Sequence, residues 1–274
     1  MKGIWLLLIV FLAGCATQPG IVDRGTYRVE TRQRAPNAFP RERFLVIHYT
    51  ADEFDGSLAM LTGRDVSVHY LLPERPPVQR NKPLIWALVP ENQIAWHAGK
   101  SFWRGTSRLN DTSIGIELVN QGYQKVGMGK RYYPFEHAQI AALIPLARDI
   151  IQRHRIAPQN VVAHADIAPQ RKVDPGPLFP WHQLALAGIG AWPEPARVAF
   201  YLSGRDPYAP VNEADVLDLL ARYGYETPPD MTQTQRRRVI AAFQMHFRPA
   251  RYDGVADAQT QAIAEALLEK YGQN

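Results

Sequence analysis

Residues 44–48 read Phe-Leu-Val-Ile-His, a continuous apolar run that ends directly in a histidine. Residues 161–164 repeat this arrangement as Val-Val-Ala-His, and residues 113–119 read Ser-Ile-Gly-Ile-Glu-Leu-Val. Short continuous apolar runs are typical of strands that are buried in a sheet. We therefore expect a β-sheet in which two strands each carry an imidazole at the end where the strand meets the surface.

The segment between the last two of these strands carries the pattern of an amphipathic helix. Its apolar residues follow the i, i+3, i+4, i+7 spacing of one helix face, and they are Ile140, Leu143, Ile144, Ala147, Ile150 and Ile151. Pro145 lies inside this pattern and should kink the helix or remove one of its hydrogen bonds. The combination predicts an α/β fold with a mixed β-sheet flanked by helices.

A small three-helix domain is expected in the C-terminal part of the chain. Asn212 can cap a first helix, Thr232 and Gln235 form a capping box for a second, and Asp257 starts a third. Three helices in about 70 residues make a compact bundle with a modest core.

Composition excludes several protein classes. Of the 274 residues, 46% are hydrophobic and 21% are charged, which is ordinary for a globular protein and excludes disordered, collagen-like and multi-span membrane chains. Cys15 is the only cysteine, so the chain cannot form an intramolecular disulfide or a multi-cysteine metal site. Any metal must therefore be bound by the eight histidines and the carboxylates.

Three residues near the expected strand ends form a candidate metal site. His48 and His164 each end an apolar run, and Asp174 follows ten residues after His164. Two histidines and a carboxylate leave the fourth position of a tetrahedral zinc site open for water. Glu117 lies inside an apolar strand, where burial favours the protonated form and suits a general base. Two simpler interpretations stay open: the histidines are core residues, and Glu117 faces water on an edge strand.

Six phrases in sequence order connect these residues to a known family. They are Phe44–Thr50, Ser67–Tyr70, Ala95–Gly99, Asn110–Glu117, His164–Pro169 and Arg171–Pro177. Over residues 40–185 the chain resembles the zinc-dependent N-acetylmuramoyl-L-alanine amidases, the amidase-2 family, which is related to the peptidoglycan recognition proteins. The resemblance implies one Zn²⁺ per chain and peptidoglycan or muropeptides as the binding partner.

The same resemblance assigns roles residue by residue. His48, His164 and Asp174 match the zinc ligands, Glu117 matches the catalytic glutamate, and Lys172 matches the residue that assists at the scissile carbonyl. The implied reaction is hydrolysis of the amide bond between the lactyl group of N-acetylmuramic acid and L-alanine. Zinc activates the water and Glu117 acts as general base. The alternatives are a non-catalytic peptidoglycan-binding protein and a zinc peptidase that cuts within the stem peptide.

Three further residues are expected to contact substrate. His97 and Trp96 lie at a glycine turn that can border the substrate groove, and Asn110 matches a family position that touches substrate. A structural role for His97 and an ordinary turn role for Asn110 remain equally open.

The N-terminus resembles a bacterial lipoprotein signal. Lys2 precedes an apolar stretch at residues 4–13, and the segment ends in Leu-Ala-Gly-Cys at Cys15. The resemblance implies that Cys15 is lipidated, with palmitate among its acyl chains, and becomes the new N-terminus. Ala16 stands where aspartate would indicate retention in the inner membrane, so we expect an outer-membrane lipoprotein facing the periplasm. The alternative is an ordinary signal peptide with an incidental cysteine.

Charge and proline content suggest how the rest of the chain divides. Residues 16–204 hold 22 basic and 16 acidic residues, and residues 205–274 hold 8 and 10. The segments that we expect are a signal peptide at 1–14, a lipidated tether and N-terminal arm at 15–39, the zinc amidase domain at 40–192, a linker at 193–204 and a helical domain at 205–274.

The helical domain partly resembles a peptidoglycan-binding module, and a helical cap on the catalytic domain is the equally open alternative. The three arginines at 236–238 do not indicate nucleic acid, because this domain is acidic and the protein is expected to be exported. We expect a monomer.

Overall fold

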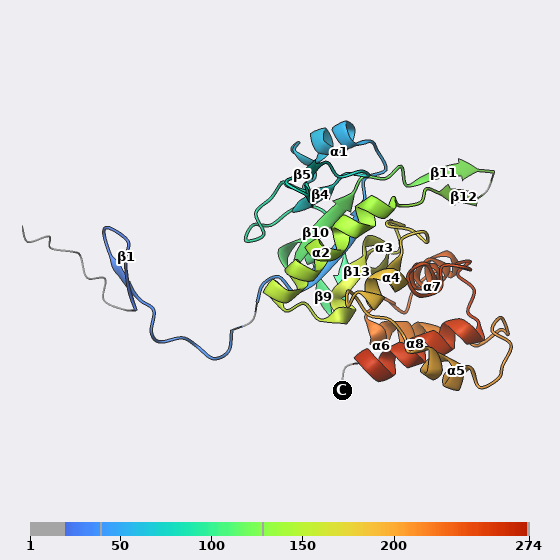
Figure 1. Cartoon of the computed structure of the whole chain (residues 1–274). Coiled ribbons are helices and arrows are strands. Elements are labelled where there is room, and N and C mark those ends of the chain that lie inside the picture. Colours follow the sequence, from blue (N-terminus) through green and yellow to red (C-terminus); the bar gives the residue numbers. More distant parts are fainter. Residues whose placement is uncertain (1–19, 39, 128, 273–274) are drawn as a thin grey trace, which may run out of the picture. The chain divides into compact units, whose positions relative to one another are not determined.

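The computed structural model describes residues 20–38, 40–127 and 129–272 (Figure 1). The expected signal peptide and Cys15 lie outside the described residues. The chain separates into a first unit up to Phe39 and a second, compact unit from Pro40 onward. The first unit contains a short antiparallel hairpin of β1 (Ile21–Asp23) and β2 (Arg28–Glu30).

The second unit is built around a mixed sheet, which confirms the predicted fold class. Five of the described strands form it in the order β13-β3-β10-β4-β7. The first four are parallel to their neighbours and β7 is antiparallel to β4. Their bounds are β13 (Val161–Ala163), β3 (Phe44–Tyr49), β10 (Ser113–Leu118), β4 (Tyr70–Leu72) and β7 (Trp86–Ala87).

Parallel pairing brings the functional residues to one edge of this sheet. His48 on β3 lies opposite Glu117 on β10. Ala163, the last residue of β13, lies opposite Ile47, so His164 follows beside His48. The carboxyl ends of parallel strands are where open α/β sheets bind their ligands. The apolar runs of β3 and β13 are buried as predicted.

The helix α2 (His137–His154) crosses one face of the sheet in Figure 1. It buries Ile140, Leu143, Ala147 and Ile150, and it continues through Pro145. Gln139 is fully buried, and its Nε2 donates to the carbonyls of Leu72 and Val119 at 3.1 and 2.9 Å. These bonds fix the helix to the strand ends.

Shorter elements surround the sheet. They are α1 (Phe54–Leu61), β5 (Val78–Gln79), β6 (Lys82–Pro83), β8 (Phe102–Trp103), β9 (Thr106–Ser107), η1 (Leu109–Asp111), β11 (Tyr123–Val126), β12 (Gly129–Tyr132), η2 (Pro158–Asn160), α3 (His164–Ile167) and α4 (Trp181–Leu186).

The C-terminal helices begin where their caps were predicted. The side chains of Asn212, Thr232 and Asp257 each accept a hydrogen bond from an amide of the first turn. The three helices are α6 (Glu213–Tyr223), α7 (Gln233–Phe247) and α8 (Ala258–Tyr271).

The segment at 193–204, expected to be a linker, instead contains the helix α5 (Pro195–Leu202), which packs against α8. Its proline occupies the first helical position, where the missing N–H costs nothing. The two prolines of this segment therefore mark the start of a helix as well as a stiff connection.

A buried carboxylate joins these helices to the sheet-bearing part. Asp166 on α3 is fully buried; its Oδ1 accepts from the Tyr225 hydroxyl at 2.6 Å. Its Oδ2 lies 2.7 Å from both the amide of Ala163 and Nδ1 of His246. The His246 ring stacks on Trp181 with 3.9 Å between centroids. Residues from α4, α7 and the loop after α6 therefore hold the turn that contains His164.

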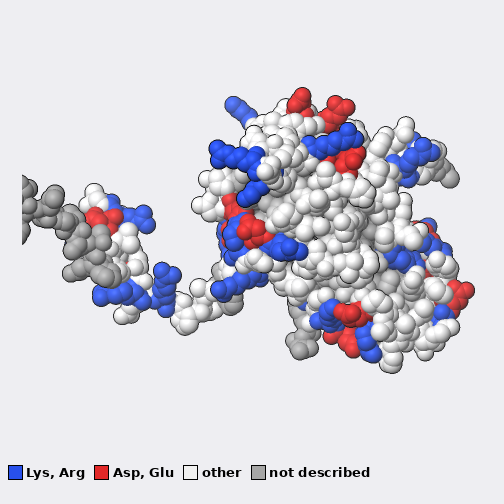
Figure 2. Space-filling view, in the orientation of Figure 1, with Lys and Arg blue, Asp and Glu red and all other residues white. Residues whose placement is uncertain are grey.

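The surface carries charges of both signs. In Figure 2 acidic and basic side chains lie next to one another over the helical part of the visible face. The Arg197–Glu269 pair, at 2.7 Å, is partly exposed, and exposed pairs of this kind contribute only about 0–1 kcal/mol each. Within the described ranges, no helix is both long enough and apolar enough to cross a membrane.

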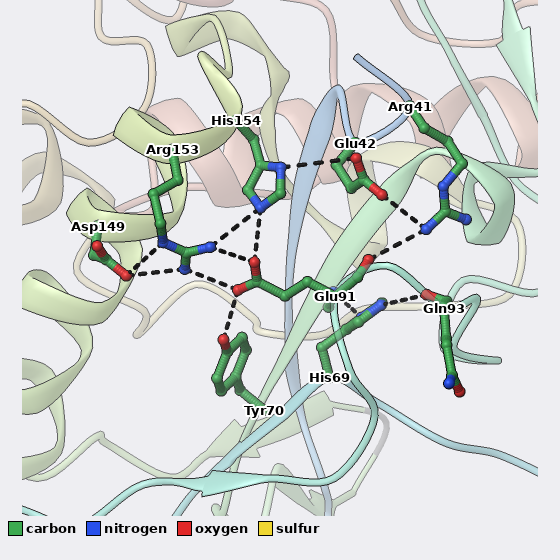
Figure 3. A network of polar contacts seen from close by, with 10 residues as sticks. Arg41, Glu42, His69, Tyr70, Glu91, Gln93, Asp149, Arg153 and His154 are labelled. Atoms are coloured by element: carbon green, nitrogen blue, oxygen red, sulfur yellow. Dashed lines mark hydrogen bonds and ion pairs between the residues drawn. The ribbon is translucent and has the colours of Figure 1, made fainter. Parts of the chain in front are cut away.

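A network around Glu91 ties the loop between β7 and β8 to the end of α2 (Figure 3). The Glu91 carboxylate accepts from the Tyr70 hydroxyl at 2.5 Å and from Arg153 Nη2 at 2.9 Å, and it lies 2.7 Å from Nε2 of His154. Hydrogen bonds from Arg153 outweigh partial burial and lower the pKa of Glu91 from its ordinary value of 4.5 to about 2. The loop that contains residues 96–99 is therefore anchored by a carboxylate that is ionised at neutral pH.

We predict that Glu91→Gln destabilises the protein by about 1–2 kcal/mol at pH 7, allowing for the partial exposure of Arg153. Because the folded pKa is depressed, the stabilisation is present above about pH 4.5 and is lost as the pH falls toward 2. Urea unfolding between pH 7 and pH 2 should therefore show the wild type losing its advantage over the variant across this window. An unchanged difference across this range would contradict the prediction.

Asp149→Asn is the matched control. It removes an exposed partner of Arg153 at 2.9 Å and leaves Glu91 in place, so its effect should stay within about 0.5 kcal/mol.

Candidate active site

The candidate site is a cavity of about 170 Å³ at the carboxyl edge of the sheet. Its walls come from the ends of β3, β10 and α1, from the turn after β13 and from three loops. The polar and aromatic residues that line it include Tyr49, Trp96, His97, Glu117, His164, Lys172 and Asp174. The structure therefore brings together most of the residues that the sequence singled out.

His48, His164 and Asp174 form a buried cluster that could hold a metal ion. Nδ1 of His48 lies 2.9 Å from Nδ1 of His164 and 3.2 Å from Oδ2 of Asp174, and the third separation is 3.1 Å. Ligands at typical zinc bond lengths in a tetrahedron lie about 3.3 Å from one another. The three atoms are thus spaced to bind one small cation.

The electrostatics of the cluster favour the forms that bind metal. Burial and the charge of His164 lower the pKa of His48 to about 4, so its imidazole is neutral at neutral pH. Burial opposes ionisation of Asp174, but the nearby imidazoles of His164 and His48 outweigh it and hold the pKa of that carboxyl well below its usual range. Neutral imidazole and ionised carboxylate are the states in which these side chains coordinate metals.

Glu117 is half-buried and faces the same cavity. Burial, with the charge of Asp174, raises its pKa well above the ordinary value, and Lys172 partly opposes this. Its Oε2 is buried and has no hydrogen-bond partner among the described side chains and backbone. The edge-strand interpretation of Glu117 is wrong, because β10 lies between β3 and β4. A buried carboxyl with a free oxygen and a raised pKa is suited to accept a proton.

Lys172 and Asp174 are positioned by a tight loop after α3. The amide of Lys172 donates to the Ala168 carbonyl at 3.0 Å, and the amide of Ala165 donates to the Asp174 carbonyl at 2.9 Å. The loop therefore closes back on the turn that contains His164, so that the cavity receives an ammonium group and a metal ligand from the same segment.

The expected substrate residues have different environments. Trp96 is 64% exposed at the cavity mouth. His97 lines the cavity, but both of its ring nitrogens contact protein atoms. Asn110 is buried, and its Oδ1 accepts from the amides of His97 and Ala98 at 3.1 and 2.7 Å. The structure thus gives Asn110 a role in holding the loop, as the turn interpretation allowed.

Sequence reasoning missed two residues around the site. Arg171 donates to the carbonyls of Ala98 and Lys100, and Asp166 anchors the turn after β13 to Tyr225 and His246. Both lie inside phrases that the family resemblance already quotes, but their partners are distant in the sequence, so spacing gave no signal for these contacts.

Two larger hollows flank the cavity. One, of about 670 Å³, is lined by residues that follow β3 and β10, including Asp52 and Asn120, together with Phe54, Trp86 and Tyr133. The other, of about 330 Å³, shares Lys172 and adds Lys130, Arg171 and Arg238. Hollows therefore lie both next to the residues that follow β3 and β10 and next to Lys172.

Comparison with known proteins agrees with this geometry. Residues 38–177 match the amidase-2 family, described as N-acetylmuramoyl-L-alanine amidase. The chain is 65% identical over 271 residues to the N-acetylmuramoyl-L-alanine amidase AmiD of Escherichia coli, a match that covers 98% of each chain.

Solved structures give the same result. A complex of E. coli AmiD with the substrate anhydro-N-acetylmuramic acid-L-Ala-D-γ-Glu-L-Lys matches with a TM-score of 0.92, covering 94% of this chain and all of that one. A complex of AmpDh3 from Pseudomonas aeruginosa with anhydromuramic pentapeptide is 42% identical, with a TM-score of 0.80, and the match covers 92% of this chain and 99% of that one. With its cluster of two histidines and an aspartate beside a buried glutamate, the chain belongs to the N-acetylmuramoyl-L-alanine amidase family.

Proposed function

We propose that the chain hydrolyses the amide bond between the lactyl group of N-acetylmuramic acid and L-alanine in peptidoglycan or its fragments, and that zinc is its metal. The observation that carries this proposal is the buried cluster of His48, His164 and Asp174 next to the unpaired carboxyl oxygen of Glu117. Two imidazoles and one carboxylate are a usual donor set for catalytic zinc. The muropeptide ligands of the related structures support the choice of substrate.

The residues of the cavity divide the chemistry among them. His48, His164 and Asp174 would hold a zinc ion, which when bound polarises the scissile carbonyl and activates a water molecule. Glu117 accepts the proton of the attacking water and delivers it to the leaving amine of L-alanine. Lys172 lines the same cavity, and its ammonium group stabilises the negative charge that develops on the carbonyl oxygen.

The hollow that shares Lys172 suits the carboxylates of a stem peptide. Its lining includes Lys130, Arg171, Lys172 and Arg238, and no aspartate or glutamate is among the described residues that line it. A basic wall attracts an acidic ligand before contact. This supports a muropeptide substrate whose peptide extends toward α7.

The two alternative functions remain distinguishable. A binding protein without turnover has no use for a general base, so the presence of Glu117 and Lys172 in one cavity disfavours it. A zinc peptidase acting within the stem peptide would use the same donor set, and only the products separate it from the amidase.

We also propose that the protein is a lipoprotein of the outer membrane that faces the periplasm, anchored through acyl chains on Cys15. The support is the signal sequence that ends at this cysteine, followed by alanine. One acyl chain alone binds a membrane marginally, whereas several give a stable anchor.

The first test of the activity uses the chain from Ala16 onward and a defined N-acetylmuramoyl tetrapeptide. We expect mass spectrometry to detect free N-acetylmuramic acid and an intact peptide that begins with L-alanine. A chelator should abolish the reaction, and added zinc should restore it. Fragments cut inside the peptide would indicate the peptidase, and the absence of cleavage with zinc bound would indicate the binding protein.

The role of Glu117 is tested by Glu117→Gln, which keeps the shape of the side chain and removes the base. We predict that kcat falls at least about 100-fold, while the zinc content, measured by plasma mass spectrometry, stays at one ion per chain. The exposed Glu226→Gln is the matched control and should keep full activity. Full activity of the Glu117 variant with metal bound would exclude Glu117 as the base.

The anchor is tested by Cys15→Ala in the full chain, expressed in a Gram-negative host. We predict that the wild type labels with palmitate and fractionates with the outer membrane, because acyl chains on Cys15 hold it there. The variant should incorporate no palmitate and should leave the outer-membrane fraction. A variant that still fractionates with the outer membrane would contradict anchoring through Cys15.

A further inference from the structure

Each histidine of the metal cluster has a second ring nitrogen that faces away from the cluster, and both of these nitrogens meet the same loop. Nε2 of His164 lies 3.2 Å from the carbonyl oxygen of Ala98. Nε2 of His48 lies 2.9 Å from Nδ1 of His97, the residue just before Ala98. A metal-bound histidine ordinarily donates this second N–H to a carbonyl, a carboxylate or water. At His48 the partner is another imidazole.

We propose that the loop of residues 96–99 sets the tautomer of both metal-binding histidines, and that His97 is a positioning residue that leaves Nδ1 of His48 free to bind metal. The inference rests on the proposed metal site, but its central claim concerns where protons lie in the protein itself.

Hydrogen-bonding contacts run from His48 through His97 and Ser113 to the carbonyl of Leu109. The donor and acceptor in each contact follow from this last carbonyl. The carbonyl oxygen of Leu109 can only accept, so the hydroxyl of Ser113 gives its single proton to it, at 2.5 Å. Ser113 Oγ must then accept from Nε2–H of His97, 3.2 Å away. In a neutral imidazole the other nitrogen, Nδ1 of His97, is therefore an acceptor. It receives the proton of His48 Nε2, which leaves His48 Nδ1 unprotonated.

The second histidine reaches the same state by a shorter route. The carbonyl of Ala98 can only accept and lies 3.2 Å from Nε2 of His164, whereas Arg171 Nη2, which can only donate, lies farther from that nitrogen at 3.4 Å and already donates to two carbonyls. The shorter contact assigns the proton of His164 to Nε2 and leaves Nδ1 unprotonated. Arg171 donates to the same carbonyl, which helps to fix its position. Nδ1 of His48, Nδ1 of His164 and Oδ2 of Asp174 then face one another as three acceptors, 2.9–3.2 Å apart, with no proton between them. A cation satisfies all three.

The loop is built to keep this arrangement. Asn110 Oδ1 accepts from the amides of both His97 and Ala98, so one side chain fixes the two residues that contact the metal-binding histidines. The His97 ring is 8% exposed and meets His48 edge to face, with 5.0 Å between centroids. A Cβ on Gly115 would lie 2.6 Å from Cγ of His97. Glycine on the neighbouring strand therefore makes room for the ring.

The decisive experiment observes the tautomers directly. The chain from Ala16 onward, which retains every described residue, is prepared without metal, and long-range ¹H–¹⁵N spectra of its histidines are recorded at pH 7.5. We expect His48 and His164 as Nε2–H tautomers in the wild type. In His97→Phe, which keeps the ring volume but accepts no hydrogen bond, the His48 signal should shift toward the Nδ1–H form. His48 as Nδ1–H in the wild type would overturn the proposal.

Zinc affinity supplies the second measurement, by equilibrium competition with a chromogenic chelator. We expect His97→Phe to raise the Kd for zinc about 10–100-fold, as for other groups that orient metal ligands. His97→Asn should recover most of this loss, because its Oδ1 can accept from His48. The exposed His137→Phe is the matched control and should match the wild type. A Kd for His97→Phe within twofold of the wild type would overturn the proposal.

Ser113→Ala serves if His97→Phe does not fold. Without its acceptor, Nε2 of His97 no longer has to carry the proton, so both tautomers of His48 should become visible. A single, unchanged Nε2–H signal of His48 in this variant would overturn the proposed role of the Ser113–His97–His48 hydrogen bonds. If the wild type fails to bind zinc but shows the expected tautomers, the proposed function is wrong, whereas the proposal that the loop sets the tautomers of His48 and His164 still holds.

Discussion

The register between three parallel strands is the constraint on which the site depends. β3 pairs with β10 so that His48 lies opposite Glu117, and with β13 so that His164 emerges beside His48. A slip by one residue would turn every side chain of a strand to the opposite face of the sheet. The strands are apolar and both faces of the sheet are covered. A register shift would therefore also expose apolar side chains and bury polar ones. The same packing that stabilises the fold thus fixes the distance between His48 and Glu117, the proposed metal ligand and base.

Burying several polar groups close together costs free energy of folding unless each one has a hydrogen-bond partner. This chain meets that cost with residues that are distant in the sequence. Asn110 holds the loop of residues 96–99, the Glu91 network anchors that loop to α2, and Asp166 fixes the turn at His164 through Tyr225 and His246. Glu117 keeps a buried oxygen that none of the described groups satisfies, and this is the atom that the proposed chemistry needs.

The fold and the positions of the two clustered histidines could be predicted because their signals are local. An apolar run that ends in histidine indicates both a buried strand and the position of its imidazole, and caps such as Thr232 with Gln235 mark helix starts. The role of Asn110 could not be read in the same way, because a turn residue and a substrate residue look alike until its partners are known. The helix α5 was missed because a proline pair describes a stiff connection and a helix start equally well.

The C-terminal helices offered two alternatives, a glycan-binding module or a cap on the catalytic domain, and the contacts show that this part of the chain supports the turn at His164. Tyr225 and His246 supply two of the three bonds to Asp166, and removing them would leave a fully buried carboxylate that lacks compensation. The same helices line the basic hollow beside Lys172 through Arg238 and Met245. Supporting the turn that contains His164 and lining the basic hollow are therefore two consequences of one packing arrangement, in which α7 lies against α3.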